Sequence, residues 1–218
     1  MTERRPNPRC VVKVGKGRGF IIEHLVKFYY PARAFVRHRV VVTAAHCLQE
    51  LPPAHAMPNC EERTYEKLLG SLDGGKTEVW AECLFVDPIA DIAVLGCPDN
   101  QQLGDEADAY HELTDNVPVL RIDDARSGRG WVLSLDGHWV RTTLEVFSGP
   151  DGMVLSIDPT EAGMSGSPVL NDTGRAVGVV VVGQETVSTA NGERRNERAG
   201  PQPMLMRNLP GWLLQFQR

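Results

Sequence analysis

The chain has 218 residues, 42% of them hydrophobic, which fits one structural unit with a sizeable core. Lys and Arg total 23 against 28 Asp and Glu, and the formal net charge of -5 excludes the strongly basic character typical of nucleic-acid-binding proteins. No apolar run follows the charged N-terminal segment MTERRPNPRC, so the sequence predicts neither a secretory signal nor a membrane-spanning segment.

Short β-branched runs separated by Gly and Pro recur along the chain and predict an all-β barrel or sandwich. The regular alternation with helices that a parallel sheet requires is missing. The runs span residues 10–14, 19–24, 39–45, 77–86, 92–97, 118–122, 130–135, 139–147, 153–157, 167–171 and 176–183.

Helix is expected in only a few places. Residues 61–70, EERTYEKLLG, carry apolar side chains at helical spacing and end in glycine, which predicts a short helix. Residues 208–218 also predict a helix, with Asn208 as its N-cap. The acidic residues 98–117 are expected to link two halves, with a turn of helix at most, and residues 184–203 to form a polar loop.

The five cysteines are odd in number and irregularly spaced, which argues against a secreted disulfide framework. They form no CxxC pair, and the histidines near them lack zinc-ligand spacing, so the sequence predicts no metal site and no other cofactor. Free thiols are typical of reducing compartments, which favours a cytoplasmic location.

The segment VVVTAAHCL, residues 40–48, runs from an apolar strand into small residues and then His46. Two alanines allow a sharp backbone turn that brings the imidazole out at a strand end. A histidine after a strand is also a common structural residue. The rival histidines do not follow such a turn; they are His24, His38, His55, His111 and His138.

The segment ADIAVLG, residues 90–96, places Asp91 at the start of an otherwise apolar run. A carboxylate at the edge of a buried strand requires hydrogen-bond partners. The alternative role for Asp91 is to cap a turn, and Asp87 is the second candidate acid because it also stands at a strand end.

The segment EAGMSGSPVL, residues 161–170, places Ser165 between two glycines that permit a tight turn. Such a turn exposes the serine oxygen and can aim the N–H groups of Gly163 and Ser165 at one point, where an oxyanion would form. The alternative is a Gly/Ser hairpin turn without chemistry. Ser148 and Ser167 are weaker candidates for the nucleophile.

The three segments together indicate nucleophilic catalysis. A weak nucleophile, a base that titrates near neutrality and a buried carboxylate that orients the base are the requirements of Ser–His–Asp chemistry. The order His46, Asp91, Ser165 is that of one known solution on β-barrels.

The segments TAAHC, DIAVL and GMSGSP resemble the signature segments of trypsin-like serine peptidases. The region through GRAVGVV is similar to the high-temperature-requirement branch and to intracellular bacterial trypsin-like domains, and the resemblance spans residues 10–215. It implies two packed six-stranded antiparallel β-barrels with a catalytic triad of His46, Asp91 and Ser165 in the cleft between them. The implied boundaries are about 10–97 and 118–207 for the barrels, 98–117 for the linker and 208–218 for a C-terminal helix.

The resemblance also implies a serine endopeptidase that cleaves protein or peptide substrates. Met164 stands where trypsin has an Asp that pairs with a new N-terminus, which predicts activity without N-terminal processing. The cysteine that follows the histidine is disulfide-bonded in secreted members, but its expected partner lies near Pro31, so Cys47 is predicted to be a free buried thiol.

The specificity pocket also departs from trypsin. Pro159 occupies the position of the Asp that gives trypsin its basic specificity, and the expected pocket wall is apolar. This predicts cleavage after small or medium apolar residues, although Asp158 and Glu161 lie close in the sequence. The residues assigned to this pocket are Pro159, Val179, Val180 and Val181.

Two alternatives stay open. The same fold can serve as a catalytically silent protein-binding module, because fold does not dictate function. It can also be a protease that a regulatory or effector protein controls, with residues 98–117 and 184–203 as candidate surfaces for that partner.

Overall fold

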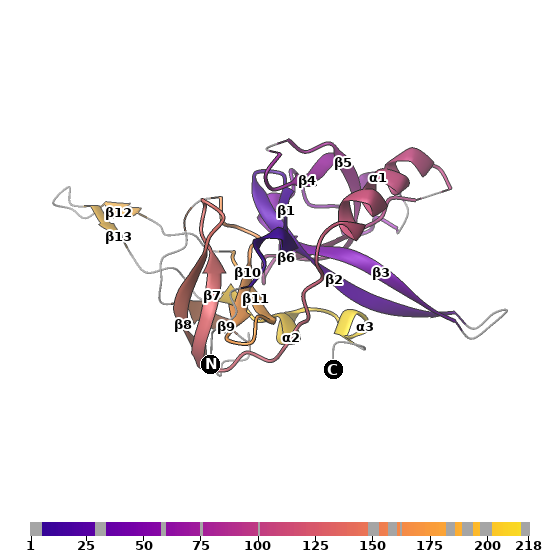
Figure 1. The fold of residues 1–218 in the computed structure, drawn as a ribbon. Helices are drawn as coiled ribbons and strands as arrows, with labels where there is room; N and C mark the ends of the chain where they lie inside the picture. The colour runs from indigo at the N-terminus through magenta and orange to yellow at the C-terminus, as the bar shows by residue number, and fades with distance from the viewer. Residues whose placement is uncertain are drawn as a thin grey trace.

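The computed structural model describes residues 6–28, 34–57, 60–74, 76–99, 101–147, 153–156, 161, 163–181, 186–188, 194–196 and 202–214. These residues form two antiparallel β-structures that lie side by side (Figure 1). Few helices accompany them, and the longest of these is α1, which packs against the first half.

The first half is a closed six-stranded barrel with the strand order β1-β2-β3-β6-β5-β4. All of its neighbouring strands are antiparallel. The β-branched runs 10–14, 19–24, 39–45, 77–86 and 92–97 all fall in this barrel. Its strands are β1 (Val11–Val14), β2 (Gly17–Phe28), β3 (Ala34–Ala44), β4 (Thr64–Ser71), β5 (Val79–Asp87) and β6 (Ile92–Gly96).

The second half is a six-stranded antiparallel sheet with the order β11-β10-β7-β8-β9-β14. A bridge between Gly178 and Met204 brings its two outer edges together, so the sheet curves back on itself. Its strands are β7 (Gly128–Leu133), β8 (Trp139–Phe147), β9 (Met153–Ser156), β10 (Pro168–Asn171), β11 (Ala176–Val179) and β14 (Gln202–Pro203). The predicted all-β fold of two six-stranded halves is confirmed.

The remaining elements are short. A two-stranded hairpin of β12 (Thr186–Ser188) and β13 (Arg194–Asn196) stands apart from both sheets (Figure 1), within the segment predicted to be a polar loop. The 3-10 helices are η1 (Pro8–Cys10), η2 (Ala45–Cys47) and η3 (Glu61–Arg63). The α-helices are α1 (Gly104–Asp115), α2 (Leu205–Asn208) and α3 (Gly211–Leu214).

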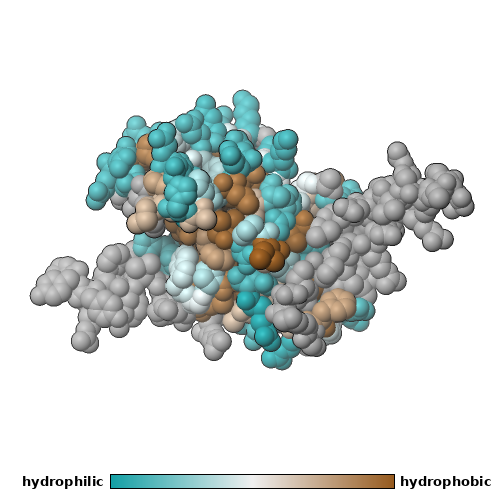
Figure 2. Space-filling view, turned by 180° about the vertical axis from the view of Figure 1, so that it is seen from behind, coloured by the Kyte–Doolittle hydropathy of each residue, from teal (hydrophilic) through white to brown (hydrophobic). Residues whose placement is uncertain are grey.

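The core is aliphatic and comes from the strands. Val41, Val42, Val94 and Leu95 are fully buried on β3 and β6, since the central strands are covered on both faces. On the face shown in Figure 2, hydrophilic residues dominate the upper part and hydrophobic residues gather at the middle. The β-branched runs therefore supply the interior, as their composition predicts.

The predicted helix at residues 61–70 is wrong. Those residues form η3 and most of β4, and the register of β4 against β5 shifts between Tyr65 and Leu69. Lys67 adopts a φ of 49° within this irregularity. Four residue steps of β4, from Tyr65 to Leu69, oppose two steps of β5, from Ala81 to Val79, so β4 carries two extra residues here. Leu68 and Leu69 are both buried, so the inward-facing side chains imitate the i, i+3, i+4 spacing of a helix.

Helix α1 is longer than the single turn expected between the two halves. Its inner face is formed by Ala107, Tyr110 and Thr114, which are buried. The Tyr110 hydroxyl donates to the carbonyl of Arg39 at 3.0 Å and lies 3.3 Å from that of Leu95. The acidic residues lie mostly on the solvent side, and they concealed the amphipathic pattern of this segment.

Two other predicted elements also differ. Residues 118–122 form no strand and contribute one bridge, between Ile122 and Ala176. The C-terminal helix is divided into α2 and α3, and Asn208 ends α2 rather than capping a helix that follows, because its side-chain amide donates to the carbonyl of Met204 at 2.8 Å. Residues 215–218 lie outside the described residues.

The long hairpin of β2 and β3 pairs His24 directly with His38. Their ring centroids are 5.4 Å apart, and Trp212 of α3 lies edge-on to His24. Nδ1 of His24 and Nε2 of His38 are buried without a hydrogen-bond partner among the described residues. Burial lowers the pKa of both rings; the pKa of His24 is lowered further by His38, and that of His38 by His111.

We predict that the free energy of unfolding decreases as the pH falls from 7 to 5. The unfolded histidines take up protons near pH 6.5, whereas the folded pair resists protonation to lower pH, so acid favours the unfolded state. Urea titrations at several pH values should show a weaker pH dependence for His24→Gln than for the wild type. The control is His55→Gln, because His55 is exposed. If the free energy of unfolding fell equally with pH in the wild type, His24→Gln and His55→Gln, the buried histidine pair would not be the cause.

We predict that Tyr110→Phe lowers the free energy of unfolding by about 1 kcal/mol, because the hydroxyl of a fully buried side chain and its hydrogen bond to the carbonyl of Arg39 on β3 are lost. The matched control is Tyr65→Phe, whose hydroxyl donates to the carbonyl of Glu50 at an exposed position. That change should cost less than about 0.5 kcal/mol. Urea denaturation measures the free energy of unfolding of both variants. An equal loss in the two would show that the buried hydrogen bond of Tyr110 contributes no more than the exposed one of Tyr65.

Candidate active site

Strand pairing brings His46 and Asp91 together. The last residue of β3, Ala44, pairs with the first residue of β6, Ile92. The ladder continues by one further bond, from the N–H of Ala45 to the carbonyl of Asp91 at 3.0 Å. The register therefore places the residue after Ala45 beside the residue before Ile92, although they are far apart in the sequence.

The Asp91 carboxylate makes two contacts with His46. Oδ2 lies 2.6 Å from Nδ1 of the ring, and Oδ1 accepts the backbone N–H of His46 at 2.9 Å. A carboxylate only accepts, so this contact assigns the proton to Nδ1 and leaves Nε2 to act as a base. Asp91 holds a φ of 55°, a conformation that aspartate tolerates better than most residues and that clusters at functional sites.

The pair is accessible from solvent. The side chain of His46 is 46% exposed and that of Asp91 is 28% exposed. The sequence suggested a buried carboxylate, and the partial exposure of Asp91 corrects that expectation. The exposure leaves the imidazole accessible to a bound peptide.

Ser165 lies in a turn held open by glycines. Gly163 and Gly166 have φ values of 95° and 82°. The N–H of Met164 donates to the carbonyl of Glu161 at 3.0 Å, and the positive φ of Gly163 is typical of the third position in a type II turn. Within the described residues, neither the N–H of Gly163 nor that of Ser165 donates a hydrogen bond, so both are available to an incoming acceptor.

The serine turn is attached directly to the first barrel. The N–H of Arg18 on β2 donates to the carbonyl of Ser165 at 2.7 Å. A Cβ on Gly166 would overlap the carbonyl oxygen of Arg18 and would lie 2.6 Å from Oγ1 of Thr43, which itself donates to that carbonyl at 2.7 Å. We call these contacts of β2 and β3 with Ser165 and Gly166 the seam.

The seam also brings Ser165 close to the histidine segment. A Cβ on Gly17 would overlap Sγ of Cys47 and would lie 2.7 Å from the carbonyl oxygen of Ser165. Gly17 therefore lies between the serine turn and the residue that follows His46. The described contacts include no hydrogen bond between Nε2 of His46 and Oγ of Ser165.

The residues assigned to the specificity pocket lie beside the serine turn. The N–H of Gly166 donates to the carbonyl of Val180 at 2.7 Å, and the N–H of Val180 donates to the carbonyl of Ser167 at 2.9 Å. The side chains of Val179, Val180 and Val181 are buried in the core. Pro159 and Asp158 lie outside the described residues.

The rival candidates have other roles in the described structure. Asp87 caps a turn, since its Oδ1 accepts the N–H groups of Ile89 and Ala90 at 2.9 and 3.0 Å. Ser167 is fully buried, and His24 is paired with His38. Ser148 lies outside the described residues. Geometry therefore favours Asp91 over Asp87 as the partner of His46.

Three residues of the seam were not singled out in the sequence: Gly17, Arg18 and Thr43. The sequence signal is GRG in a strand, where glycines on both sides of an arginine permit close approach of another backbone. That signal is weak without the contact itself.

The five cysteines are free, as the sequence predicts. Cys47 is buried, and burial raises the pKa of its thiol. Pro31, named as the position of its expected partner, lies outside the described residues, and Gly17 is among the residues packed against Cys47. Met164 is also buried and belongs to the core of the second half.

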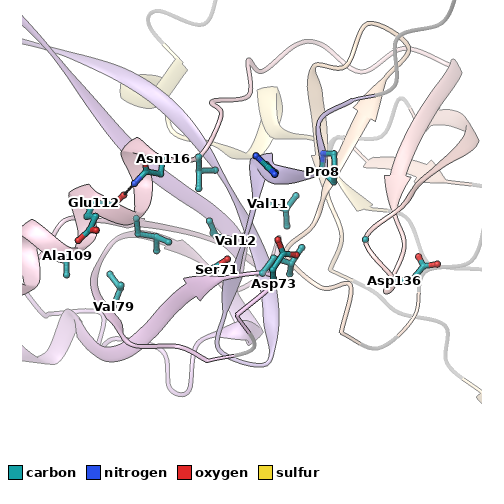
Figure 3. Close-up of a pocket in the computed structure, with 15 residues that line it drawn as sticks. Pro8, Val11, Val12, Ser71, Asp73, Val79, Ala109, Glu112, Asn116 and Asp136 are labelled. Carbon is teal, nitrogen blue, oxygen red and sulfur yellow. Dashed lines mark hydrogen bonds between the residues drawn. The ribbon is translucent and has the colours of Figure 1, made fainter.

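A cavity of about 690 Å³ lies away from this site (Figure 3). It is bordered by β1, by α1 and by the turn between β7 and β8, and Figure 3 shows Val11 and Val12 near its middle with Glu112 and Asp136 on opposite sides. None of His46, Asp91 and Ser165 lines it. This cavity is therefore not the candidate active site.

Among the described residues, no three His, Cys, Asp or Glu side chains are arranged to bind a metal ion. None of the described helices combines the length and the apolar character needed to span a bilayer.

We predict that Gly166→Ala destabilises the chain more than Gly174→Ala. Both glycines have similar positive φ values, 82° and 78°, but a Cβ on Gly174 meets nothing within 4 Å. The strained backbone conformation should cost about 1–3 kcal/mol at either site. The overlap with Arg18 should add a further 1–3 kcal/mol or so at Gly166 alone. Urea denaturation compares the two, and equal losses would contradict the close packing of the seam.

Comparison with known proteins shows to which family the chain belongs. Solved structures to which the chain is similar include the Rv3671c protease of M. tuberculosis in an inactive form (18% identity, TM-score 0.46, 95% of each chain covered). They also include a human pathogenic astrovirus serine protease (15%, TM-score 0.47, 95% of this chain and 98% of that one) and the MamO protease domain from Magnetospirillum magneticum (14%, TM-score 0.49, 91% and 93%).

The search of curated proteins gave no match. The family model described as "Trypsin-like peptidase domain" matches residues 19–179, which include His46, Asp91 and Ser165. This match covers most of the chain, and the chain therefore belongs to the trypsin-like peptidase family.

Proposed function

We propose that the protein is a serine endopeptidase with a catalytic triad of His46, Asp91 and Ser165. The observation that carries the proposal is the double contact of Asp91 with His46, at 2.6 and 2.9 Å, next to a serine turn that the seam holds against the same barrel. A base oriented by a carboxylate near a partly exposed serine is the arrangement that activates a hydroxyl nucleophile.

In this mechanism Nε2 of His46 takes the proton of the Ser165 hydroxyl as Oγ attacks the carbonyl carbon of a peptide bond. Asp91 holds the ring through Nδ1 and stabilises the imidazolium that forms. The N–H groups of Gly163 and Ser165 stabilise the tetrahedral oxyanion. The imidazolium then protonates the leaving amine, and water releases the acyl group by the same steps in reverse.

The substrate preference is proposed to be for small or medium apolar residues before the cleaved bond. Pro159 replaces the acidic residue that would attract Lys or Arg, and the neighbouring backbone carries valines at positions 179, 180 and 181. Because these side chains are packed in the core, their contribution to the pocket comes through the backbone beside Gly166. Protein or peptide substrates are the expected partners.

Activity is proposed to need no new N-terminus. Met164 is apolar and buried next to Ser165, and its sulfur lies 3.1 Å from the backbone nitrogen of Glu161. A group that packs in the core holds the serine turn without an ion pair. The five free cysteines support a reducing compartment such as the cytoplasm.

A second candidate is a trypsin-like fold that a partner protein activates, or that binds proteins without cleaving them. The missing hydrogen bond between His46 and Ser165 favours this candidate. Catalytic contacts are often long before substrate binds, so the same observation is compatible with an active enzyme.

We predict that a fluorophosphonate probe labels the purified protein and that Ser165→Ala and His46→Ala abolish the labelling. Such probes react with an activated serine, which both changes remove. Asp91→Asn should slow labelling by several orders of magnitude, about 10⁴-fold in the best-known triad. Gel fluorescence and mass spectrometry measure the adduct.

The controls are Ser167→Ala and Asp87→Asn, which should label like the wild type. Labelling that survives in Ser165→Ala would refute the triad. A well-folded wild type that is not labelled would favour the partner-activated or non-catalytic candidate instead.

A further inference from the structure

Arg18 connects the first barrel to the second through its side chain. The residue is 5% exposed. Its Nη1 donates to the carbonyl of Ser134 at 2.8 Å and to that of Leu133 at 3.2 Å, and its Nη2 donates to the carbonyl of Leu135 at 3.0 Å. One guanidinium thus serves three consecutive carbonyls at the turn between β7 and β8.

The backbone of the same residue holds the serine. Its N–H donates to the carbonyl of Ser165 at 2.7 Å, and its own carbonyl accepts Oγ1 of Thr43 at 2.7 Å while packing against Gly166. The position of Arg18 therefore fixes the C-terminal end of the serine turn.

The turn bound by the guanidinium lies beside the N-terminal end of the serine turn. A Cβ on Gly163 would lie 3.3 Å from Cδ2 of Leu135. Arg18, Leu135 and Gly163 line one cavity of about 320 Å³. One residue is thus connected to both ends of the serine turn: the backbone of Arg18 holds the carbonyl of Ser165, and its side chain holds the β7–β8 turn, in which Leu135 lies beside Gly163.

Arg18 places a charged guanidinium in a buried position between the two halves. Burying a guanidinium is costly unless every donor finds an acceptor. Burial lowers the pKa of Arg18, and the carboxylate of Asp136 opposes that effect. An apolar side chain would fill the space, but it could not donate to three carbonyls as the rigid, planar fork of arginine does.

On the proposed function, we infer that Arg18 is a positioning residue for the oxyanion hole. Its backbone holds Ser165, and its guanidinium holds the β7–β8 turn so that Leu135 fixes Gly163. The N–H groups of Gly163 and Ser165 thereby stay directed at the same point, where the oxyanion forms. Arg18 touches no reacting atom, and it acts through the geometry of these two residues.

The test measures fluorophosphonate labelling over a range of probe concentrations, which separates the maximal rate from the half-saturating concentration. Arg18→Lys should lower the maximal rate about tenfold or more, because a displacement of reacting groups by an ångström costs up to 100-fold or so. One ammonium cannot span three carbonyls. The half-saturating concentration should change little, since the oxyanion forms only in the transition state.

The matched control is Arg39→Lys. Arg39 is also partly buried and donates to two carbonyls, those of Thr114 at 2.6 Å and Val117 at 3.3 Å, but it contacts neither the β7–β8 turn nor the serine turn in these bonds. The Arg39→Lys variant should therefore be labelled at the maximal rate of the wild type.

A second variant tests the route through the turn. Leu135 is 47% exposed, so Leu135→Ala should fold normally and still lower the maximal rate. Combined with Arg18→Lys, it should slow labelling by no more than the slower single change, since both act on Gly163. If the rate losses of the two single variants multiply in the double variant, Arg18 does not act on Gly163 through Leu135. A wild-type maximal rate for Leu135→Ala would also overturn this route, even if Arg18→Lys failed to fold.

The outcomes separate the two claims. Folded Arg18→Lys that labels at the wild-type maximal rate overturns the role of Arg18 and leaves the triad in place. A changed half-saturating concentration with an unchanged maximal rate also overturns it, because Arg18 would then affect binding alone. A folded wild type that is never labelled overturns the proposed function itself.

Discussion

The contact on which the site depends is the seam, where the N–H of Arg18 meets the carbonyl of Ser165 and Gly166 packs against the same strand. The two halves of the molecule fold from different segments and are joined by α1, so nothing local fixes the serine relative to the histidine. A backbone hydrogen bond between β2 and the serine turn, with no side chain between the two segments, leaves little freedom. Gly166 is required there because any Cβ would overlap the carbonyl of Arg18.

The His46–Asp91 pair depends on a different constraint, the register of β3 against β6. Pairing of Ala44 with Ile92 determines which residues meet beyond the strand ends, and a shift by one residue would turn Val42 and Val94 away from the faces they now occupy. The core thus enforces the register, and the register places the base beside its carboxylate. The positive φ of Asp91 is a local cost that this arrangement maintains.

Sequence patterns predicted the all-β fold and the three candidate residues because these depend on β-branched runs and on short motifs. They failed where a local irregularity or a tertiary contact decides the outcome. The bulge near Lys67 made a strand look helical, and α1 is stabilised by Tyr110 reaching β3 and β6 rather than by its own composition. The role of Arg18 was out of reach, since its partners lie more than a hundred residues away.

Ser165 as an activated nucleophile held next to its base is the central proposal for this protein. Intact-protein mass spectrometry during reaction with an activated ester tests this most directly. We predict a transient acyl adduct that maps to Ser165, decays with turnover and is absent from Ser165→Ala. An adduct on another residue, or none on the folded protein under conditions where the ester is in excess, would contradict it.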